Sequence, residues 1–152
     1  LGKVPFPLLN ISPANQSLAY KRDAYNAMNY LEFVSDHYVG LNLTHTFNGF
    51  LLNKVPLIKH LKWREFISAK ILYGGLRAEN DPAQSTGLYR LPAATNSSNG
   101  TYTLGSKPYI EAGAGIGNIF KFLRIDLIRR YTYLDQPGAR IFSIKFSFQP
   151  EF

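Results

Sequence analysis

A two-residue period near the end of the chain is the feature that most constrains its fold. Across residues 141–152, the side chains of one side are almost all large and apolar, and those of the other side are mostly polar. Successive side chains of a β-strand point to opposite faces, so this pattern predicts a strand with one apolar and one polar side. The apolar side is formed by Phe142, Ile144, Phe146, Phe148, Pro150 and Phe152.

The same alternation recurs along the chain and predicts an all-β, antiparallel fold. Further strands are expected at 38–47, 64–76, 109–118 and 124–133. Segment 17–33 is predicted as a sixth strand, although its alternation is lost from Asn29 onward. The apolar side chains of 124–133 that share one side are Ile125, Leu127, Tyr131 and Tyr133, and Arg129 interrupts them.

Keeping the apolar faces on one side predicts the strand register. In the first hairpin, Glu111 is expected opposite Arg130, and Ile116 opposite Ile125. In the second hairpin, Gln136-Pro137-Gly138-Ala139 has the composition of a type II turn. A hairpin centred on it brings Arg124 toward Glu151 and Tyr131 toward Ile144.

The connections differ in length and composition. Residues 78–106 are rich in Asn, Ser, Thr, Gly and Pro and are too long for an ordinary turn, which predicts a flexible or functional loop. Residues 49–63 contain Pro56 and spaced apolar residues, so this turn could include one or two helical turns. These two connections lie at opposite ends of the predicted strands. For an outer-membrane barrel, considered below, whose last strand ends in the periplasm, residues 49–63 would be a periplasmic turn and residues 78–106 an extracellular loop.

Composition argues against several classes of function. The net charge is +7 and the pI about 9.7, but the 17 Lys and Arg residues are scattered, so no nucleic-acid partner is expected. The chain has no Cys, and its histidines, His37, His45 and His60, are not spaced as metal ligands. It lacks a G-x-S-x-G motif, and its closest approach to a dinucleotide loop (113–118) lies within an alternating segment. We therefore expect no enzyme activity, no metal and no cofactor.

An apolar face of this kind either closes over a soluble core or contacts lipid. The terminal strand favours lipid, because outer-membrane strands commonly end in alternating aromatics that the assembly machinery recognises. Phe146, Phe148 and Phe152 are the candidates for this C-terminal assembly signal. Trp63, Tyr73, Tyr131 and Tyr133, near strand ends, fit the aromatic girdles of membrane barrels. A soluble antiparallel barrel or sandwich acting as a binding module is the alternative.

Charged side chains occur on the opposite, polar face of the predicted strands. In a barrel wall they would face the lumen, where they could line a pathway or clamp a plug segment. The simpler interpretation, which we favour, is that they pair with one another across strands. The lumen-facing candidates are Glu111, Arg124, Asp126, Arg130 and Lys145.

A second charged group lies in the turn before the strand at 64–76. Lys54, Lys59, His60, Lys62 and Arg64 are interspersed with Val55, Ile58, Leu61 and Trp63. This stretch fits a lipid headgroup surface and a solvated turn equally well.

Several runs along the chain carry a family resemblance. They are residues 2–9, 28–36, 47–50, 53–57, 61–65, 108–113 and 124–126. Together they resemble a domain-of-unknown-function family of Gram-negative outer-membrane proteins. Members carry a carboxypeptidase-regulatory-like domain before a C-terminal barrel similar to bacterial surface antigen (outer-membrane assembly factor) barrels. The resemblance implies the same location for this chain, but it defines no activity. Arg129 departs from it, since an aromatic residue is expected there.

These observations predict that residues 1–152 are the C-terminal part of one transmembrane β-barrel domain, contributing about six strands to a larger barrel. The chain begins at Leu1 in mid-pattern, so the rest of the barrel is expected upstream. The expected location is the outer membrane, with lipid and the barrel-assembly machinery as partners. A role in transport or in outer-membrane protein biogenesis follows, with a pore, an insertase and a lipid-modifying enzyme left open as alternatives.

Overall fold

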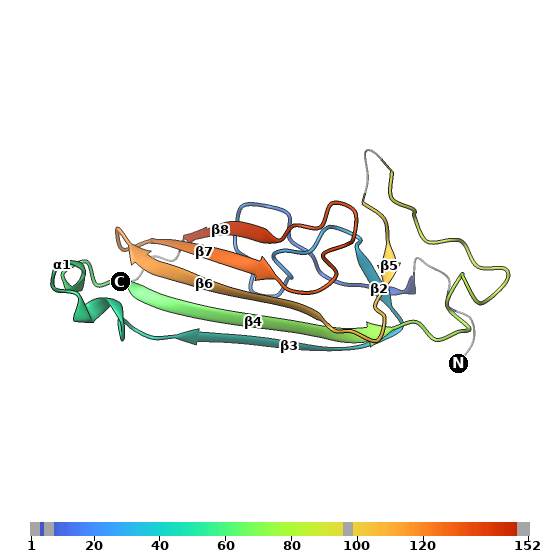
Figure 1. The fold of residues 1–152 in the computed structure, drawn as a ribbon, viewed down its shortest axis with the longest axis horizontal. Coiled ribbons are helices and arrows are strands. Elements are labelled where there is room, and N and C mark those ends of the chain that lie inside the picture. The colour runs from blue at the N-terminus through green and yellow to red at the C-terminus, as the bar shows by residue number, and fades with distance from the viewer. Residues whose placement is uncertain (1–3, 5–7, 96–98, 149–152) are drawn as a thin grey trace.

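The computed structural model describes residue 4, residues 8–95 and residues 99–148, and a five-stranded antiparallel sheet dominates it (Figure 1). The fold is all-β, as predicted, and the five segments that alternate most clearly all form strands. No helix among the described residues is long and apolar enough to cross a membrane. The sheet is open in this part of the chain. Its order is β3 (His37–Thr46), β4 (Arg64–Gly75), β6 (Tyr109–Ile119), β7 (Leu123–Arg130) and β8 (Phe142–Phe148).

The prediction of a sixth strand at 17–33 is wrong. Only Phe33 of this range belongs to a strand, β2 (Phe33–Ser35), and the rest follows irregular loops against one face of the large sheet (Figure 1). A single parallel bridge joins Ala19 to Phe146 of β8. We call residues 8–35 the N-terminal segment and the sheet face that it covers the inner face.

A small second sheet joins the start of the N-terminal segment to its end. β1 (Asn10–Ile11) pairs antiparallel with β2, and β2 pairs in parallel with β5 (Tyr102–Thr103). The apolar core lies next to this small sheet, and in it aromatic rings from the segment pack against side chains of the large sheet. Its buried members are Tyr25, Met28, Phe33, Leu72, Leu104 and Tyr109.

The two ends of the large sheet carry different connections (Figure 1). Between β3 and β4 the chain forms a 3-10 helix, η2 (Leu52–Lys54), and a single α-helical turn, α1 (Pro56–Lys59), which begins with proline. The β6–β7 turn and the end of β8 lie at this same end, since Leu123 pairs with Phe148. Residues 78–106 leave from the opposite end and include only one strand, β5, among their described residues.

The predicted register is right for one hairpin and wrong for the next. Glu111 pairs with Arg130 and Ile116 with Ile125, as expected. Arg124 pairs with Ser147, whereas Glu151 lies outside the described residues, and Ile144 faces Leu127 in place of Tyr131.

The cause is the form of the β7–β8 connection. The predicted turn exists, with Ala139 N–H donating to the Gln136 carbonyl at 3.0 Å and Gly138 at φ 72°, but it does not sit at the centre of the hairpin. β7 already ends at Arg130, and Tyr133, at φ 55°, packs its ring against Phe33. Tyr133 therefore does not join the outward apolar row that the sequence predicted. The even shift of four positions (147 in place of 151) preserves the two faces of the sheet.

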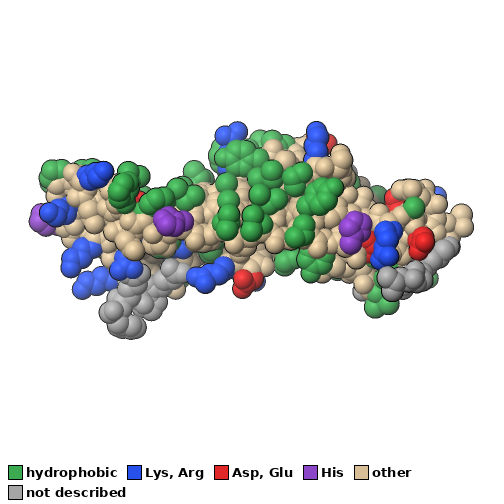
Figure 2. Space-filling view, turned by 90° about the horizontal axis from the view of Figure 1, so that it is seen from below, with side chains coloured by type: hydrophobic (Ala, Val, Ile, Leu, Met, Phe, Trp, Pro, Cys, Tyr) green, Lys and Arg blue, Asp and Glu red, His purple; other side chains and the backbone are tan. Residues whose placement is uncertain are grey.

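The two faces of the large sheet are opposite in character. On the outer face, apolar side chains such as Val39, Leu127 and Ile144 are 65%, 50% and 54% exposed. Figure 2 shows hydrophobic side chains spread over the middle of the sheet. On the inner face, Glu111 and Arg130 are 1% and 0% exposed. The arrangement is inverted relative to a water-soluble sheet protein, which buries its apolar face.

Candidate functional site

The candidate site is a layer of buried charged side chains between the inner face and the N-terminal segment. Each side chain of this charged layer is at most 3% exposed. Charges removed from water to this extent need partners, because desolvation otherwise costs several kcal/mol. The charged layer consists of Glu32, Lys70, Glu111, Arg124, Asp126, Arg130 and Lys145.

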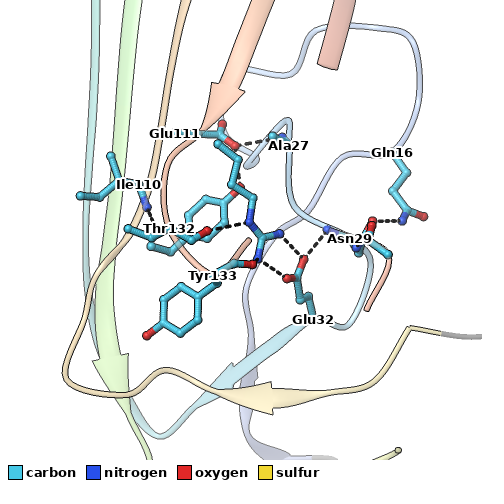
Figure 3. Close-up of polar contacts among 11 residues, drawn as sticks. Gln16, Ala27, Asn29, Glu32, Ile110, Glu111, Thr132 and Tyr133 are labelled. Carbon is cyan, nitrogen blue, oxygen red and sulfur yellow. Dashed lines mark hydrogen bonds and ion pairs between the residues drawn. The ribbon is translucent and has the colours of Figure 1, made fainter. Parts of the chain in front are cut away.

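Arg130 of β7 contacts the N-terminal segment through Glu32, whose polar contacts are drawn in Figure 3. Its Nη2 lies 2.6 Å from Glu32 Oε1 and its Nη1 3.0 Å from Glu32 Oε2, a bidentate ion pair with both side chains at most 1% exposed. The guanidinium also donates to the carbonyls of Thr132 and Tyr133, at 2.9 and 2.6 Å. Glu32 Oε2 in turn accepts the backbone N–H of Asn29 at 2.8 Å. This geometry fixes the end of the segment against β7.

Glu111 of β6 binds the backbone of the same segment. Its two carboxylate oxygens accept the N–H groups of Asn26 and Ala27, at 2.8 and 2.9 Å, and Oε2 also accepts the Tyr109 hydroxyl at 3.0 Å. Burial, together with the charge of Glu111 and the neighbouring Tyr38, raises the pKa of Tyr25 to about 12. The Glu111 carboxylate thus satisfies the backbone N–H groups of residues 26 and 27, which belong to no strand.

Lys70 of β4 binds the segment through carbonyl groups. Its ammonium donates to the carbonyls of Lys21, Arg22 and Ala24, at 3.1, 2.8 and 2.5 Å. These three acceptors match the three donors of an ammonium group. Lys70 was not among the candidates predicted from the sequence. The alternation of β4 could have identified it, because Ile67 and Tyr73 point outward and Lys70 therefore points to the inner face.

Lys145 of β8 does the same farther along the segment. Its Nζ donates to the carbonyls of Asn15 and Ser17, at 2.9 and 2.5 Å. Just beyond, Phe146 exchanges backbone hydrogen bonds with residues 18 and 20, at 2.8 and 2.7 Å. The segment is therefore held both by a side chain and by the edge of β8.

Arg124 and Asp126 pair with each other along β7. Arg124 Nε and Nη2 lie 2.7 and 2.6 Å from the two carboxylate oxygens, and the guanidinium stacks 3.9 Å from the ring centroid of Phe66. Space for this pair comes from Gly115 and Gly117 of β6. A Cβ at Gly115 would lie 2.3 Å from Asp126 Oδ1, and one at Gly117 2.4 Å from the Phe66 ring. The glycines that resembled a dinucleotide loop are thus packing positions within a strand.

The structure thus brings all five lumen-facing candidates to one buried face, but not in the way that we favoured. Of the five, only Arg124 and Asp126 pair with each other, and they do so within one strand. Glu111 and Arg130 are cross-strand neighbours whose carboxylate and guanidinium bind different parts of the N-terminal segment. The cross-strand interpretation is therefore wrong for Glu111, Arg130 and Lys145, and the contacts are those of a clamp on a segment.

Glu32 was not among the candidate site residues predicted from the sequence. It accepts the backbone N–H of Asn29, and its charged partner is Arg130. The described residues contain no group of three or more His, Asp or Glu side chains arranged to hold a metal ion.

Asp36, just before β3, organises the end of the sheet from which the long loop leaves. Its carboxylate accepts hydrogen bonds from His37 Nδ1 at 2.5 Å, Arg77 Nε at 3.0 Å and Asn80 Nδ2 at 2.6 Å. Burial acts to raise its pKa, but these hydrogen bonds outweigh it and hold the pKa well below its usual range. The carboxylate is therefore a structural anion that joins β3 to residues 77–80.

The predicted C-terminal assembly signal lies partly within the described residues. Phe146 and Phe148 point outward from β8, with exposed fractions of 36% and 74%. The ring of Phe148 stacks on that of Phe122, the residue just before β7. Phe152 lies outside the described residues. Arg129, the departure from the family pattern, is exposed on the outer face near the end of β7, with its guanidinium over the rings of Tyr131 and Phe142.

Comparison with known proteins supports the resemblance to a family of unknown function over part of the chain. The C-terminal domain of a family of unknown function (DUF5686) matches residues 11–78. This stretch contains most of the N-terminal segment, β3 and β4, and so includes Glu32 and Lys70 of the charged layer. No curated protein and no solved structure matches the chain. The family description assigns no activity to the domain.

Proposed function

We propose that this chain is the C-terminal part of a larger outer-membrane β-barrel, with the outer face of its sheet in lipid and its N-terminal segment docked on the lumenal wall. In this role the chain is not a catalyst. It supplies wall strands and a bound internal segment to a protein of transport or outer-membrane biogenesis.

One observation carries the proposal, the inverted distribution of side chains across the sheet. Exposed large apolar residues occur on the outer face of β3, β4, β7 and β8, whereas the inner face carries the charged layer. A monomeric soluble protein rarely leaves a contiguous apolar patch of several strands in water. In a membrane barrel, apolar side chains face lipid and polar ones face the interior.

Strand dimensions and aromatic positions agree with this arrangement. β3, β4 and β6 have 10, 12 and 11 residues, which suits a tilted strand across the hydrocarbon core. Exposed aromatics lie at both ends of the outer face, as in the interfacial girdles of membrane barrels. At the α1 end these are Phe50, Phe120, Phe122 and Phe148, and at the other end Tyr73 and Tyr131.

The edges of the sheet support a larger barrel. β3 and β8 form the two margins of the large sheet. Residues 18–20 pair with the edge of β8 at Phe146, whereas β3 has a sheet neighbour on one side only among the described residues. Unpaired backbone groups are very costly in hydrocarbon, and membrane sheets therefore close on themselves. Additional strands would pair with β3 and with the part of the β8 edge that residues 18–20 leave uncovered, in accordance with the expected upstream part of the barrel.

Spin-label accessibility tests the location directly. In the full-length protein reconstituted into phosphatidylcholine vesicles, nitroxide labels are attached at Leu43→Cys and Thr44→Cys, adjacent exposed positions on opposite faces of β3. We expect the label at 43 to collide more with lipid-soluble oxygen and the label at 44 more with a water-soluble nickel chelate. Equal exposure of both labels to the nickel chelate would overturn the membrane location and favour the soluble binding module.

The choice among functions within the membrane needs separate measurements. Ion current through the protein in planar bilayers supports a pore, and accumulation of unassembled barrel proteins after gene deletion supports a biogenesis factor. Catalysis would require loss of lipid hydrolysis on replacing His45, which contacts Phe47 at a ring-centroid distance of 4.5 Å.

A further inference from the structure

The α1 end of the sheet contains a second polar feature that the wall function does not use. A cavity of about 590 Å³ opens between the β3–β4 connection and the β6–β7 turn. Asn118 Nδ2 donates to the Lys62 carbonyl at 2.7 Å and joins these two connections across it. The cavity is lined by Asn48, Asn53, Lys59, Lys62, Trp63, Arg64 and Asn118.

Among the described residues, every charged side chain that lines this cavity is positive. The two connections beside it, residues 46–64 and 117–125, contain no Asp or Glu, but they include Lys54, Lys59, Lys62 and Lys121. The adjacent carboxylate, Glu65, is occupied by backbone N–H groups of the turn, which it accepts from Gly49, Leu51 and Leu52. Figure 2 shows Lys and Arg side chains gathered at the α1 end. An anion in the cavity would balance this charge, with amide and ammonium donors from its walls.

The two connections beside the cavity also carry exposed apolar side chains. Leu57 and Phe120 are 85% and 78% exposed, and Phe50 and Leu61 60% and 51%. These side chains belong to the same end of the sheet as the cavity. A free phosphate would make no use of them, whereas a phospholipid has a phosphate for the cavity and acyl chains for the apolar surface.

We infer that this cavity binds the phosphate headgroup of an anionic phospholipid, with the acyl chains along the outer face. The inference rests on the proposed membrane location and adds the lipid class and the end of the barrel at which it binds. Lys59 and Lys62, both exposed, attract the phosphate, and Trp63 lies at the boundary between headgroup and hydrocarbon.

Native mass spectrometry of bound lipids tests this assignment. The full-length protein is equilibrated in detergent micelles containing equal amounts of phosphatidylglycerol and phosphatidylcholine, and the retained lipids are counted. We expect wild type to retain more phosphatidylglycerol than phosphatidylcholine. In the Lys59→Gln/Lys62→Gln variant, the ratio of the two retained lipids should fall by about fivefold for each lysine removed. The matched control, Arg90→Gln/Lys107→Gln, removes two exposed charges from outside the cavity and should retain the preference.

Three results would overturn the assignment. Equal retention of the two lipids by wild type would show that no anionic headgroup is selected. An equal loss in the two double variants would show a general effect of charge. Displacement of phosphatidylglycerol by inorganic phosphate, but not by chloride at the same ionic strength, would reduce the site to a free-phosphate site. Because retention is measured in micelles, a negative result here is distinguishable from failure of the spin-label test.

Discussion

The two faces of the large sheet use the same strands in opposite ways. The outer face presents apolar side chains that make few contacts within the chain, and the inner face buries charges that bind a segment distant in sequence. Period-two alternation predicts the first arrangement, because it depends only on neighbouring residues. On the inner face, the partners of Lys70, Glu111, Arg130 and Lys145 in the N-terminal segment are 46 to 130 positions away, and no local pattern encodes them. Stability should therefore depend on the inner face, and membrane compatibility on the outer face.

The largest effect should come from separating the buried ion pair. Arg130→Met leaves Glu32 charged and without its bidentate partner, and breaking such a pair costs about 3–5 kcal/mol. Arg129→Met is the matched control, because the neighbouring arginine is exposed on the outer face and its loss should change stability by less than about 0.5 kcal/mol. Urea unfolding of the reconstituted protein measures both. Equal losses would mean that the two faces do not differ as described.

The contacts of Arg130 show which parts of the structure could be predicted from the sequence. The pairing of Glu111 with Arg130 was predictable because a short turn at 119–122 links their strands and the apolar faces must align. The contact of Arg130 with Glu32 was not, since Glu32 lies in a segment whose backbone is held by side chains of the sheet. The alternation of β4 would have placed Lys70 on the inner face, but Lys70 was not predicted as a candidate. The β7–β8 register failed because Tyr133 turns inward to Phe33, a tertiary contact that ends the strand early.

A charge in the middle of the outer face gives the next largest effect. Leu127 is 50% exposed and pairs with Ala114 and Ile144 near the centre of the sheet. Leu127→Arg should cost about 2–4 kcal/mol if this position faces the bilayer midplane. Tyr131→Arg, at the end of the same face, should cost about 0–1 kcal/mol. Unfolding in vesicles reports both values, and a negligible cost at 127 would indicate that the outer face is in water.

A methyl group on the inner face should have a smaller but clear effect. Gly115→Ala places its Cβ within 2.3 Å of Asp126 Oδ1 and 2.9 Å of the Ile125 carbonyl, so the Arg124–Asp126 pair or the strand must shift. Overpacking of this kind typically costs about 1–3 kcal/mol. Ala114→Val, one position away on the exposed outer face, should change stability by less than about 0.5 kcal/mol. A tolerated Gly115→Ala would show that the charged layer is loosely packed.

The smallest effect concerns the end of the sheet, where both faces meet the long loop. The folded-state pKa of Asp36 is held below its ordinary value of 3.8 by hydrogen bonds from Asn80, His37 and Arg77. A carboxyl group with a lowered pKa stabilises the fold fully above the unfolded-state pKa, and this contribution disappears as pH falls through the folded-state pKa. Asp36→Asn should therefore cost about 1–2 kcal/mol at pH 7 and progressively less below about pH 4.

Asp135→Asn provides the comparison for Asp36, because Asp135 is an exposed acidic residue. Its removal should leave stability unchanged across the same pH range, within about 0.5 kcal/mol. Urea unfolding at pH 7 and at pH 3 measures the four values needed. If the gap between wild type and Asp36→Asn stayed constant with pH, the carboxylate charge would not be what holds residues 77–80 to β3. If instead the gap closes, the link between sheet and loop is electrostatic, unlike the apolar contacts of the outer face.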